Sequence, residues 1–574
     1  MKTLDLHCDY IKFKALKKAL KNIDELSPEQ NLEGESKDCL VVFIAIEEND
    51  SESLIEKLVA DVEKISSDVK TKNVVLYPYS HLSSNLAKPA EAIKILGIAR
   101  EKLEKKFNLV SAPFGYYKEF ELKVKGHPLS ELSRDFTDGE KAIKTKTSIE
   151  AKEEKYDEKQ LLRQISKSKL DTSKLKENDH RILGQKLDLF SFQDVAPGMV
   201  FWHNNGLIIK NELVDFWREE HRKAEYKEIE TPQILDKKLW LISGHWDKYK
   251  DNIFLTNYEN RTFAVKPMNC PGGMLVYKAT QKSYRDLPLR VAELGIVHRQ
   301  ELSGVLAGLF RVIKFTQDDA HIFCTEDQLE GEISNIIKII DTFYKKFNIE
   351  FDHVELSTRP EKRMGDEKTW DLAESTLENV LKKRKMNYKL NPGDGVFYGP
   401  KIDFHVKDSL GRTWQLSTIQ LDFQMPERFE LEYTDKDNSK KRPIMLHRVI
   451  YGSLERFLGI LLEHTNGNLP TWLSPIQVRV LSFTDRNIEA SKKFILQIAE
   501  QIPNLRIDAD FTSTTVNEKV RNAEMMKIPY IITIGDKEEE KKTIAIRERG
   551  NKKLQVVKPE DFMNKIKEKI EKRE

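Results

Sequence analysis

The pattern of apolar and polar residues predicts a separate N-terminal domain. Within residues 1–135, short apolar runs at 40–46 and 74–77 have the length of buried strands. Residues 53–65 and 90–107 instead repeat apolar positions at helical spacing. Because strand and helix patterns alternate over this stretch, we expect an α/β domain of its own.

Three further segments follow along the chain. Residues 136–182 are rich in Lys, Glu and Ser with only a thin apolar stripe, which predicts a solvated helical linker. A basic linker lying beside an RNA is the alternative for this charge run. Residues 183–471 are denser in aromatic residues, Gly and Pro, and predict a large globular domain. Residues 472–574 return to short strands and helices, which predicts a mixed sheet with covering helices.

Composition narrows the function classes. A chain of 574 residues is too long for one compact domain, because domains average about 150 residues. Lys+Arg 95 against Asp+Glu 93 leaves +2, so a nucleic-acid partner would need positive charge arranged in patches. Apolar runs fall far below the ~18 residues that span a bilayer, and the first residues lack the apolar core of a signal peptide. The four cysteines are too scattered for a disulfide framework, so we expect a cytoplasmic protein with no membrane contact.

Arginines are the candidate phosphate-binding groups. The chain has no G-x-x-x-x-G-K-[ST] loop, and residues 393–399 match a dinucleotide fingerprint only superficially. Arg299 and Glu301 precede a turn and then a strand-like alternation, which predicts two antiparallel strands joined by a loop. Arg456 lies near the start of an apolar helix. Each arginine alone is typical of a surface ion pair, but the two contexts together are informative.

These contexts resemble motifs 2 and 3 of class II aminoacyl-tRNA synthetases, and residues 229–232 resemble motif 1 with its proline at a dimer interface. From about residue 180 to the end, longer runs resemble the threonyl-tRNA synthetase family: GMVFWHN at 198–204, GHW at 244–246, KPMNCPG at 266–272, FTQDDAHIFC at 315–324, FYGPKI at 397–402 and HRVIYGSLER at 447–456. The resemblance implies a class II antiparallel-sheet catalytic domain, a C-terminal mixed α/β anticodon-binding domain and a homodimer formed through the catalytic domain. It also implies ATP-dependent ligation of L-threonine to tRNA(Thr) through threonyl-adenylate.

The same resemblance implies a zinc site formed by Cys270, His321 and His447. Spacing alone does not select these three among 4 Cys and 13 His. One thiolate and two imidazoles would leave a tetrahedral zinc ion with an open position, as in a working site. Gly273 departs from the family pattern, in which many relatives have His, and this puts one contact beside the pocket in doubt. The other three cysteines are expected only to fill space.

Further site residues are implied in the same way. Arg299 would bind the α-phosphate, while Arg456 and Phe315 would stack on the two faces of adenine, since guanidinium is charged, planar and bidentate. Mg²⁺ would accompany ATP by bridging phosphate oxygens. The remaining ATP-binding residues are Glu301, Arg311 and Gln415. The threonine and adenylate pocket would comprise Gln317, Asp319, Tyr398, Gln420 and Ser453. Catalytic roles are implied for Arg299, Arg456, His245 and Lys401.

The N-terminal domain resembles the archaeal editing domain of the same family, which is related in fold to D-aminoacyl-tRNA deacylases. The resemblance rests on residues 7–10, 77–84, 115–118 and 126–132, and the H-x-x-x-H motif of the bacterial editing domain does not occur. It implies hydrolysis of Ser-tRNA(Thr) without a protein nucleophile. The matching positions are His81, Tyr117, Lys118 and Glu131, and the implied anticodon contacts are Arg521, Glu538 and Arg547.

Two alternative functions stay open at this point. A non-catalytic paralogue that binds RNA or regulates another enzyme would be favoured by loss of Arg299, Arg456 or a zinc ligand, and all of these are present. A class II synthetase for another amino acid, such as proline or serine, is disfavoured by the zinc trio.

Overall fold

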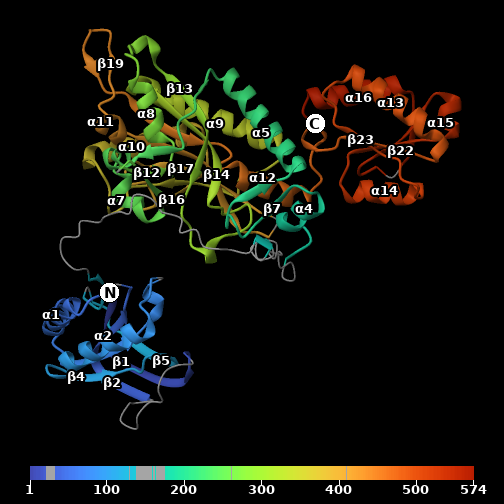
Figure 1. Cartoon of the computed structure of the whole chain (residues 1–574). Coiled ribbons are helices and arrows are strands. Elements are labelled where there is room, and N and C mark those ends of the chain that lie inside the picture. Colours follow the sequence, from blue (N-terminus) through green and yellow to red (C-terminus); the bar gives the residue numbers. More distant parts are fainter. Residues whose placement is uncertain are drawn as a thin grey trace. The chain divides into compact units, whose positions relative to one another are not determined.

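The protein is described from a computed structural model of residues 1–20, 33–136 without 49, 84 and 128, 158–159, 162, and 175–574 without 260, 409 and 552. Its contacts divide the chain into two compact units, Met1–Lys146 and Thr147–Glu574, which are treated separately (Figure 1). Most of the predicted linker, including the helix expected in it, lies outside the described residues. Among the described residues, no helix is both long enough and apolar enough to cross a bilayer.

The N-terminal unit is a six-stranded sheet with two helices on one face. Its elements are β1 (Lys2–Lys18), β2 (Glu33–Ala45), α1 (Ser53–Asp68), β3 (Asn73–Pro78), α2 (Pro89–Glu104), β4 (Asn108–Ser111), β5 (Tyr116–Val124) and β6 (Glu131–Asp135). The strand order is β4-β3-β2-β1-β5, with β6 also pairing with β1. Alternate residues of β2 pack against the helices, while Cys39, Val41 and Phe43 face the other side. The predicted α/β alternation is confirmed, although the sequence pattern did not reveal the charge-rich strand β1.

The large domain that follows is built on an eight-stranded sheet of order β16-β15-β17-β18-β21-β14-β13-β9. Its strands are β9 (Lys227–Glu228), β13 (Leu289–His298), β14 (Lys314–Cys324), β15 (His353–Ser357), β16 (Lys389–Asn391), β17 (Lys401–Lys407), β18 (Thr413–Asp422) and β21 (Ile444–Val449). All neighbours are antiparallel except β9 with β13 and β15 with β16. The antiparallel pair of β13 and β14 corresponds to the two strands predicted on either side of the loop that follows Arg299 and Glu301.

Four long helices cover this sheet, and their buried apolar residues form one core with it (Figure 1). They are α5 (Asn204–Lys223), α9 (Glu326–Lys346), α10 (Glu367–Lys383) and α12 (Leu454–Thr465). Shorter elements complete the domain: α4 (His180–Lys186), β7 (Phe190–Phe192), β8 (Val200–Trp202), β10 (Ile234–Asp236), α6 (Lys237–Ile242), α7 (His245–Tyr249), β11 (Leu255–Tyr258), β12 (Arg261–Val265), α8 (Cys270–Lys278), α11 (Gln424–Arg428), β19 (Tyr433–Thr434) and β20 (Lys440–Lys441).

The C-terminal domain is the predicted mixed sheet, with strand order β23-β22-β24-β25-β26. Its elements are β22 (Val478–Ser482), α13 (Ile488–Gln501), β23 (Ile507–Asp510), α14 (Val516–Met525), β24 (Tyr530–Ile534), α15 (Asp536–Lys541), β25 (Ile544–Glu548), β26 (Gln555–Val557) and α16 (Pro559–Glu571). Trp472 and Leu473 still belong to the core of the preceding large domain, so the core of the C-terminal domain begins a few residues later. Arg506 pairs with Glu212 of α5 and donates to the carbonyl of Ser474 at 2.9 Å, which ties the two domains together.

Candidate active site

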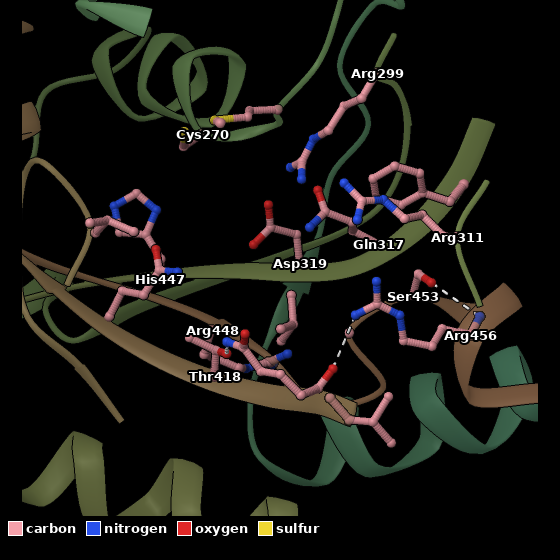
Figure 2. Close-up of a pocket in the computed structure, with 18 of the residues that line it drawn as sticks. Cys270, Arg299, Arg311, Gln317, Asp319, Thr418, His447, Arg448, Ser453 and Arg456 are labelled. Carbon is pink, nitrogen blue, oxygen red and sulfur yellow. Dashed lines mark hydrogen bonds between the residues drawn. The ribbon is translucent and has the colours of Figure 1, made fainter. Parts of the chain in front are cut away.

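A cavity of about 400 Å³ lies over β14, β18, β21 and the start of α12 (Figure 2). It gathers predicted residues that are far apart in the sequence: Cys270, Arg299, Glu301, Arg311, Phe315, Gln317, Asp319, Tyr398, Gln415, Gln420, His447, Ser453 and Arg456. In the view of Figure 2, Cys270 and His447 lie on one side, Arg299, Arg311 and Arg456 lie on the other, and Asp319 lies between them. The cavity therefore has two chemically different ends.

The Cys/His end is created by strand register. His321 of β14 lies directly opposite His447 of β21, and the centroids of the two rings are 5.0 Å apart. Cys270, the first residue of α8, reaches the same point, so one ligand atom from each of the three residues lies within 4.8 Å of the others. All three side chains are buried.

The protonation pattern leaves electron pairs available at this end. Nε2 of His447 lies 2.8 Å from Oδ2 of Asp422, so Nε2 carries the proton and Nδ1 keeps its lone pair. Nε2 of His321 is buried without a hydrogen-bond partner among the described residues. Burial raises the pKa of the Cys270 thiol well above its ordinary value, so a cation would be needed to hold the thiolate form. A sulfur and two imidazoles, one of them with an orphaned buried nitrogen, fit a zinc-type ion.

Gly273 is packed against this cluster. A Cβ atom at this position would lie 3.2 Å from Nδ1 of His321, closer than most real Cβ contacts. A larger side chain in the same backbone geometry would therefore press on a candidate metal ligand.

At the opposite end, Arg299 is half-buried and lines the cavity. Its Nε donates to the carbonyl of Pro267 at 3.0 Å, and its guanidinium carbon lies 5.2 Å from the ring centroid of Phe315. Arg311 pairs with Glu301 at 2.9 Å. Partial desolvation lowers the pKa of Arg299, and its guanidinium forms no ion pair within 4.0 Å with a carboxylate of the described residues. A half-buried cation without such a partner favours an anionic ligand such as phosphate.

Arg456 is held at the start of α12. Its Nε donates to the carbonyl of Phe310 at 2.9 Å, and one Nη donates to the carbonyl of Gln415 at 3.1 Å. Ser453, the N-cap residue of the helix, accepts from the Arg456 backbone amide. The guanidinium carbon also lies 5.6 Å from the ring centroid of Trp414. Arg456 is therefore fixed as a planar cation facing the cavity.

Polar side chains fill the space between the two ends. Asp319 lies two residues before His321 on β14 and accepts from Nδ2 of Asn269 at 3.2 Å. Burial raises the pKa of the Asp319 carboxyl. The Tyr398 hydroxyl donates to Oε1 of Gln420 at 2.7 Å. Donors and acceptors thus line the space beside the Cys/His end, as a small polar ligand requires.

Two residues with implied catalytic roles do not line the cavity. Nζ of Lys401 lies 2.8 Å from carboxylate oxygens of both Asp394 and Asp403. His245 is fully buried, with its ring 5.5 Å from that of Phe397, and burial lowers its pKa to about 3. Both therefore lie outside the cavity lining: Lys401 is linked to the lining residue Thr418 through Asp403, and the His245 ring lies 6.5 Å from that of Tyr398.

Sequence analysis did not identify three further residues of the site, Arg448 and Thr418 in the cavity lining and Asp422 beside His447. Arg448 is buried at the cavity, with its guanidinium carbon 4.5 Å from the ring centroid of Tyr226. The Thr418 hydroxyl donates to Asp403 at 2.8 Å, and Asp422 orients His447. Arg448 follows His447 in the motif at residues 447–456, so the sequence offered a signal for it. Thr418 and Asp422 belong to no motif that could have indicated their role.

In the N-terminal unit, His81 and Lys118 are linked through aromatic rings. Nζ of Lys118 donates to the carbonyl of Pro113 at 2.9 Å and lies 5.0 Å from the ring centroid of Tyr77. Burial lowers the pKa of Lys118 to about 8. His81, in the 3₁₀ turn Ser80–Leu82, lies 5.2 Å from the ring of Tyr79, which also contacts Tyr77.

Tyr117 and Glu131 are placed away from Lys118. The Tyr117 side chain is 56% exposed and, as the preceding residue of the strand, projects to the opposite side. Lys118 pairs with Ala15 of β1, whereas Glu131 pairs with Leu6. Those positions differ by nine residues, or roughly 30 Å along an extended strand. The four candidate editing residues therefore do not form one cluster.

The candidate anticodon residues lie on three elements of the C-terminal domain. Arg521 is exposed on α14, and Arg547 on β25 pairs with Ile531 of β24. Glu538 on α15 accepts from the backbone amide of Gly535 at 3.1 Å, so it has a helix-capping role in this structure.

Comparisons with known proteins agree with this architecture. Residues 1–136 match the family model described as the archaea-specific editing domain of threonyl-tRNA synthetase. Residues 254–465 match the class II tRNA synthetase core domain (G, H, P, S and T), and residues 477–569 match an anticodon binding domain.

Similar curated proteins are named threonine–tRNA ligases. One from Caldanaerobacter subterraneus subsp. tengcongensis is 55% identical over 391 residues, which cover 68% of this chain and 60% of that protein. Another, from Acetivibrio thermocellus, is 53% identical over 401 residues, covering 70% and 62%. The matched region thus spans less than two thirds of the length of these relatives.

Solved structures show the same relationship. The structure described as the RNA binding domain of threonyl-tRNA synthetase from Cryptosporidium parvum Iowa II is 40% identical with a TM-score of 0.66, and the match covers 68% of this chain and 98% of that one. Giardia lamblia prolyl-tRNA synthetase, 18% identical with a TM-score of 0.55 over 67% of this chain and 74% of that one, shares the fold. By its catalytic core, its anticodon domain and its archaeal-type editing domain, the chain belongs to the threonyl-tRNA synthetase family.

Proposed function

We propose that this chain ligates L-threonine to tRNA(Thr) at the expense of ATP. The observation that carries the proposal is the two-ended cavity, in which Cys270, His321 and His447 converge at one end and Arg299 and Arg456 at the other. The first end suits a small ligand with amino and hydroxyl groups, and the second suits a nucleotide. A single cavity can therefore bring the two reactants of adenylate formation together.

In the first step, a carboxylate oxygen of threonine attacks the α-phosphorus of ATP. The bond from that phosphorus to the bridging oxygen breaks, and threonyl-adenylate and pyrophosphate form. Arg299 would stabilise the negative charge that builds on the α-phosphate, and Arg456 and Phe315 would hold adenine. Mg²⁺ would accompany the phosphates, with Glu301, Arg311 and Gln415 completing the nucleotide pocket.

In the second step, a hydroxyl of the terminal ribose of the tRNA attacks the threonyl carbonyl and AMP leaves. His245 is proposed to assist this transfer through the cavity wall, because its buried Nε2 has no partner among the described residues. Lys401 is proposed to support the wall through Asp403, which accepts from the cavity residue Thr418.

Selection of threonine would depend on zinc held by Cys270, His321 and His447. A zinc ion with an open coordination position supplies a Lewis acid for amino and hydroxyl groups. The residues Gln317, Asp319, Tyr398, Gln420 and Ser453 would surround the bound amino acid. Valine lacks the hydroxyl, and a site built around that group rejects such an analogue by ~10⁴-fold.

Serine carries the same two groups as threonine, so the N-terminal domain is proposed to remove it. One missing methyl is worth only ~1–3 kcal/mol, or roughly 10–200-fold. Hydrolysis of Ser-tRNA(Thr) in a second site would supply the remaining discrimination. The proposed residues are His81, Tyr117, Lys118 and Glu131, with His81 and Lys118 sharing one aromatic cluster.

The proposed partners are tRNA(Thr) and a second copy of the chain. Arg521, Glu538 and Arg547 are the proposed anticodon contacts. Dimerisation through the catalytic domain is supported by exposed apolar side chains on the β10–β12–β11 sheet, where Ile234 is 54% and Tyr258 66% exposed. A cytoplasmic location completes the proposal.

Pyrophosphate exchange tests the central claim. Threonine should drive exchange of labelled pyrophosphate into ATP, whereas the other nineteen amino acids, with serine as the weak exception, should not. Exchange driven by proline or serine in preference to threonine would assign the chain to another class II specificity. No exchange with any amino acid by a folded, zinc-loaded protein would favour the non-catalytic paralogue.

A further inference from the structure

A second group of metal-ligating side chains lies outside the cavity, on β15 and β17. His353 of β15 is directly opposite His405 of β17, and Glu355 follows two residues later on the same face. One ligand atom from each of the three residues lies within 4.8 Å of the others. None of the three lines the cavity, and none has a role in the proposed reaction.

Hydrogen bonding orients the imidazole ring of His353 so that its Nε2 faces Glu355. Nδ1 of His353 lies 2.7 Å from Oδ2 of Asp352, so Nδ1 donates to that carboxylate, and a neutral ring keeps its lone pair on Nε2. Nε2 then presents a lone pair, yet it lies 3.0 Å from Oε1 of Glu355, which is also an acceptor. A carboxylate behind one imidazole nitrogen is the usual support of a metal-bound histidine.

His405 adds another acceptor. Its ring stacks on that of His353 with centroids 4.5 Å apart and planes 6° from parallel. Its Nε2 is buried, has no hydrogen-bond partner among the described residues and lies 3.5 Å from Oε2 of Glu355. Burial lowers the pKa of His405, which favours the neutral ring. Asn391 of β16 donates to Oε2 of Glu355 at 2.9 Å and holds the carboxylate in place.

The Nε2 atoms of the two histidines and the Glu355 carboxylate therefore face one another, an arrangement that a cation would satisfy. We propose that His353, Glu355 and His405 bind one divalent cation of the zinc type, which clamps β15 to β17. Two imidazoles and a carboxylate suit Zn²⁺, Co²⁺ or Ni²⁺, whereas Mg²⁺ and Ca²⁺ prefer oxygen ligands. The side chains are 15%, 20% and 16% exposed, so an ion can arrive from solvent and retain water as a further ligand.

Metal content of the full-length protein tests this site independently of the proposed activity. After zinc loading and removal of excess metal, His405→Gln should contain one zinc per chain fewer than the unmodified protein. His464→Gln, which replaces a histidine whose Nε2 lies 3.1 Å from the Asn348 carbonyl, serves as the control and should lose none. Equal zinc content in His405→Gln and the unmodified protein would overturn the proposal.

Cobalt separates the two candidate sites. Co²⁺ bound by Cys270 would show a thiolate charge-transfer band, whereas Co²⁺ at the all-N,O site would show only d–d bands. We expect His405→Gln to keep the thiolate band and lose one cobalt equivalent. If the Cys270 site bound no metal, the unmodified protein would contain one cobalt equivalent and His405→Gln would contain none. The two proposals can therefore fail separately.

Thermal unfolding tests the same site in variants that keep both histidines, in case His405→Gln misfolds. Zinc should raise the unfolding midpoint of Cys270→Ala by at least about 2 °C, because an ion that binds only the folded state stabilises it. Adding Glu355→Gln, which keeps the side-chain shape, should abolish that shift. A midpoint insensitive to zinc in Cys270→Ala would mean that a shared proton, rather than a metal, satisfies the group, and would overturn the proposal.

Discussion

His321 and His447 are directly opposed residues of adjacent antiparallel strands, and their ring centroids are 5.0 Å apart. They lie 126 positions apart in the sequence, so only the register of β14 against β21 brings them together. A slip of one residue would turn one ring to the other face of the sheet. The candidate zinc site is thus a property of strand pairing.

Replacing Cys270 should remove zinc and threonine activation together. Cys270→Ala leaves only two imidazole ligands, so the variant should contain less metal at this site. Threonine-dependent pyrophosphate exchange should fall by roughly 10²-fold or more. Cys324→Ala is the matched control, because Cys324 is also free and buried but lies outside the cavity. Wild-type-like exchange by a zinc-depleted Cys270→Ala protein would contradict the proposed role.

Asp422→Asn should weaken zinc binding without removing a ligand. Oδ1 of Asp422 accepts from the backbone amides of Gln424 and Met425, and an asparagine oxygen can keep those bonds. The partner of His447 Nε2 would then be an amide, which no longer fixes the proton as firmly. Zinc affinity, measured by competition with a chelator, should fall ~10–100-fold. The exposed Asp437→Asn should have no such effect, and an equal change in both would refute the argument.

Arg299→Ala should cripple adenylate formation. Its guanidinium lies at the arginine-lined end of the cavity, so its loss should lower the exchange rate by about 10²–10³-fold. tRNA binding should change much less, because the charge is directed at the α-phosphate. Arg285→Ala, an exposed arginine beyond the cavity, should retain full exchange. Parallel loss of exchange and tRNA binding in Arg299→Ala would point to misfolding instead.

Removal of residues 1–135 should separate synthesis from editing. The catalytic core and anticodon domain form their own compact unit, so the truncated protein should still make Thr-tRNA(Thr). It should also accumulate Ser-tRNA(Thr), since one methyl group gives only 10–200-fold discrimination. Charging with labelled serine measures this directly. If the truncated enzyme kept its tRNA as free of serine as the full chain does, the editing assignment would be wrong.

The contribution of Lys118 to editing should decline in mildly alkaline solution. Burial lowers its pKa to about 8, so the ammonium form that can donate to an ester carbonyl prevails below this pH and is lost above it. Lys118→Arg keeps its charge throughout. The ratio of wild-type to Lys118→Arg hydrolysis of Ser-tRNA(Thr) should therefore fall roughly tenfold between pH 7 and pH 9. The exposed Lys123→Ala should track wild type, and a pH-independent ratio would exclude a charged Lys118 from the reaction.

Local patterns were enough to predict many of the elements. Helical spacing over 53–65 and 90–107 corresponds to α1 and α2, and the apolar run at 74–77 to β3. Strand β1 was not predicted, because its buried residues are interspersed with many lysines. Its burial depends on pairing with β2 on one side and β5 on the other. Periodicity detects an amphipathic element by itself, whereas a strand defined by its neighbours has a weak local pattern.

By itself, the sequence determined which side chains were available for chemistry: the motif arginines, the Cys/His trio and the apolar patterns of most elements. Tertiary structure decided which of them meet. It joined His321 to His447, placed Lys401 and His245 outside the cavity lining, and paired Glu131 far along β1 from Lys118. It also brought together His353, Glu355 and His405, a group that no local sequence motif predicts. The physical reason is that helix and strand patterns depend on neighbours in sequence, whereas these distances depend on the register of strands joined by long connections.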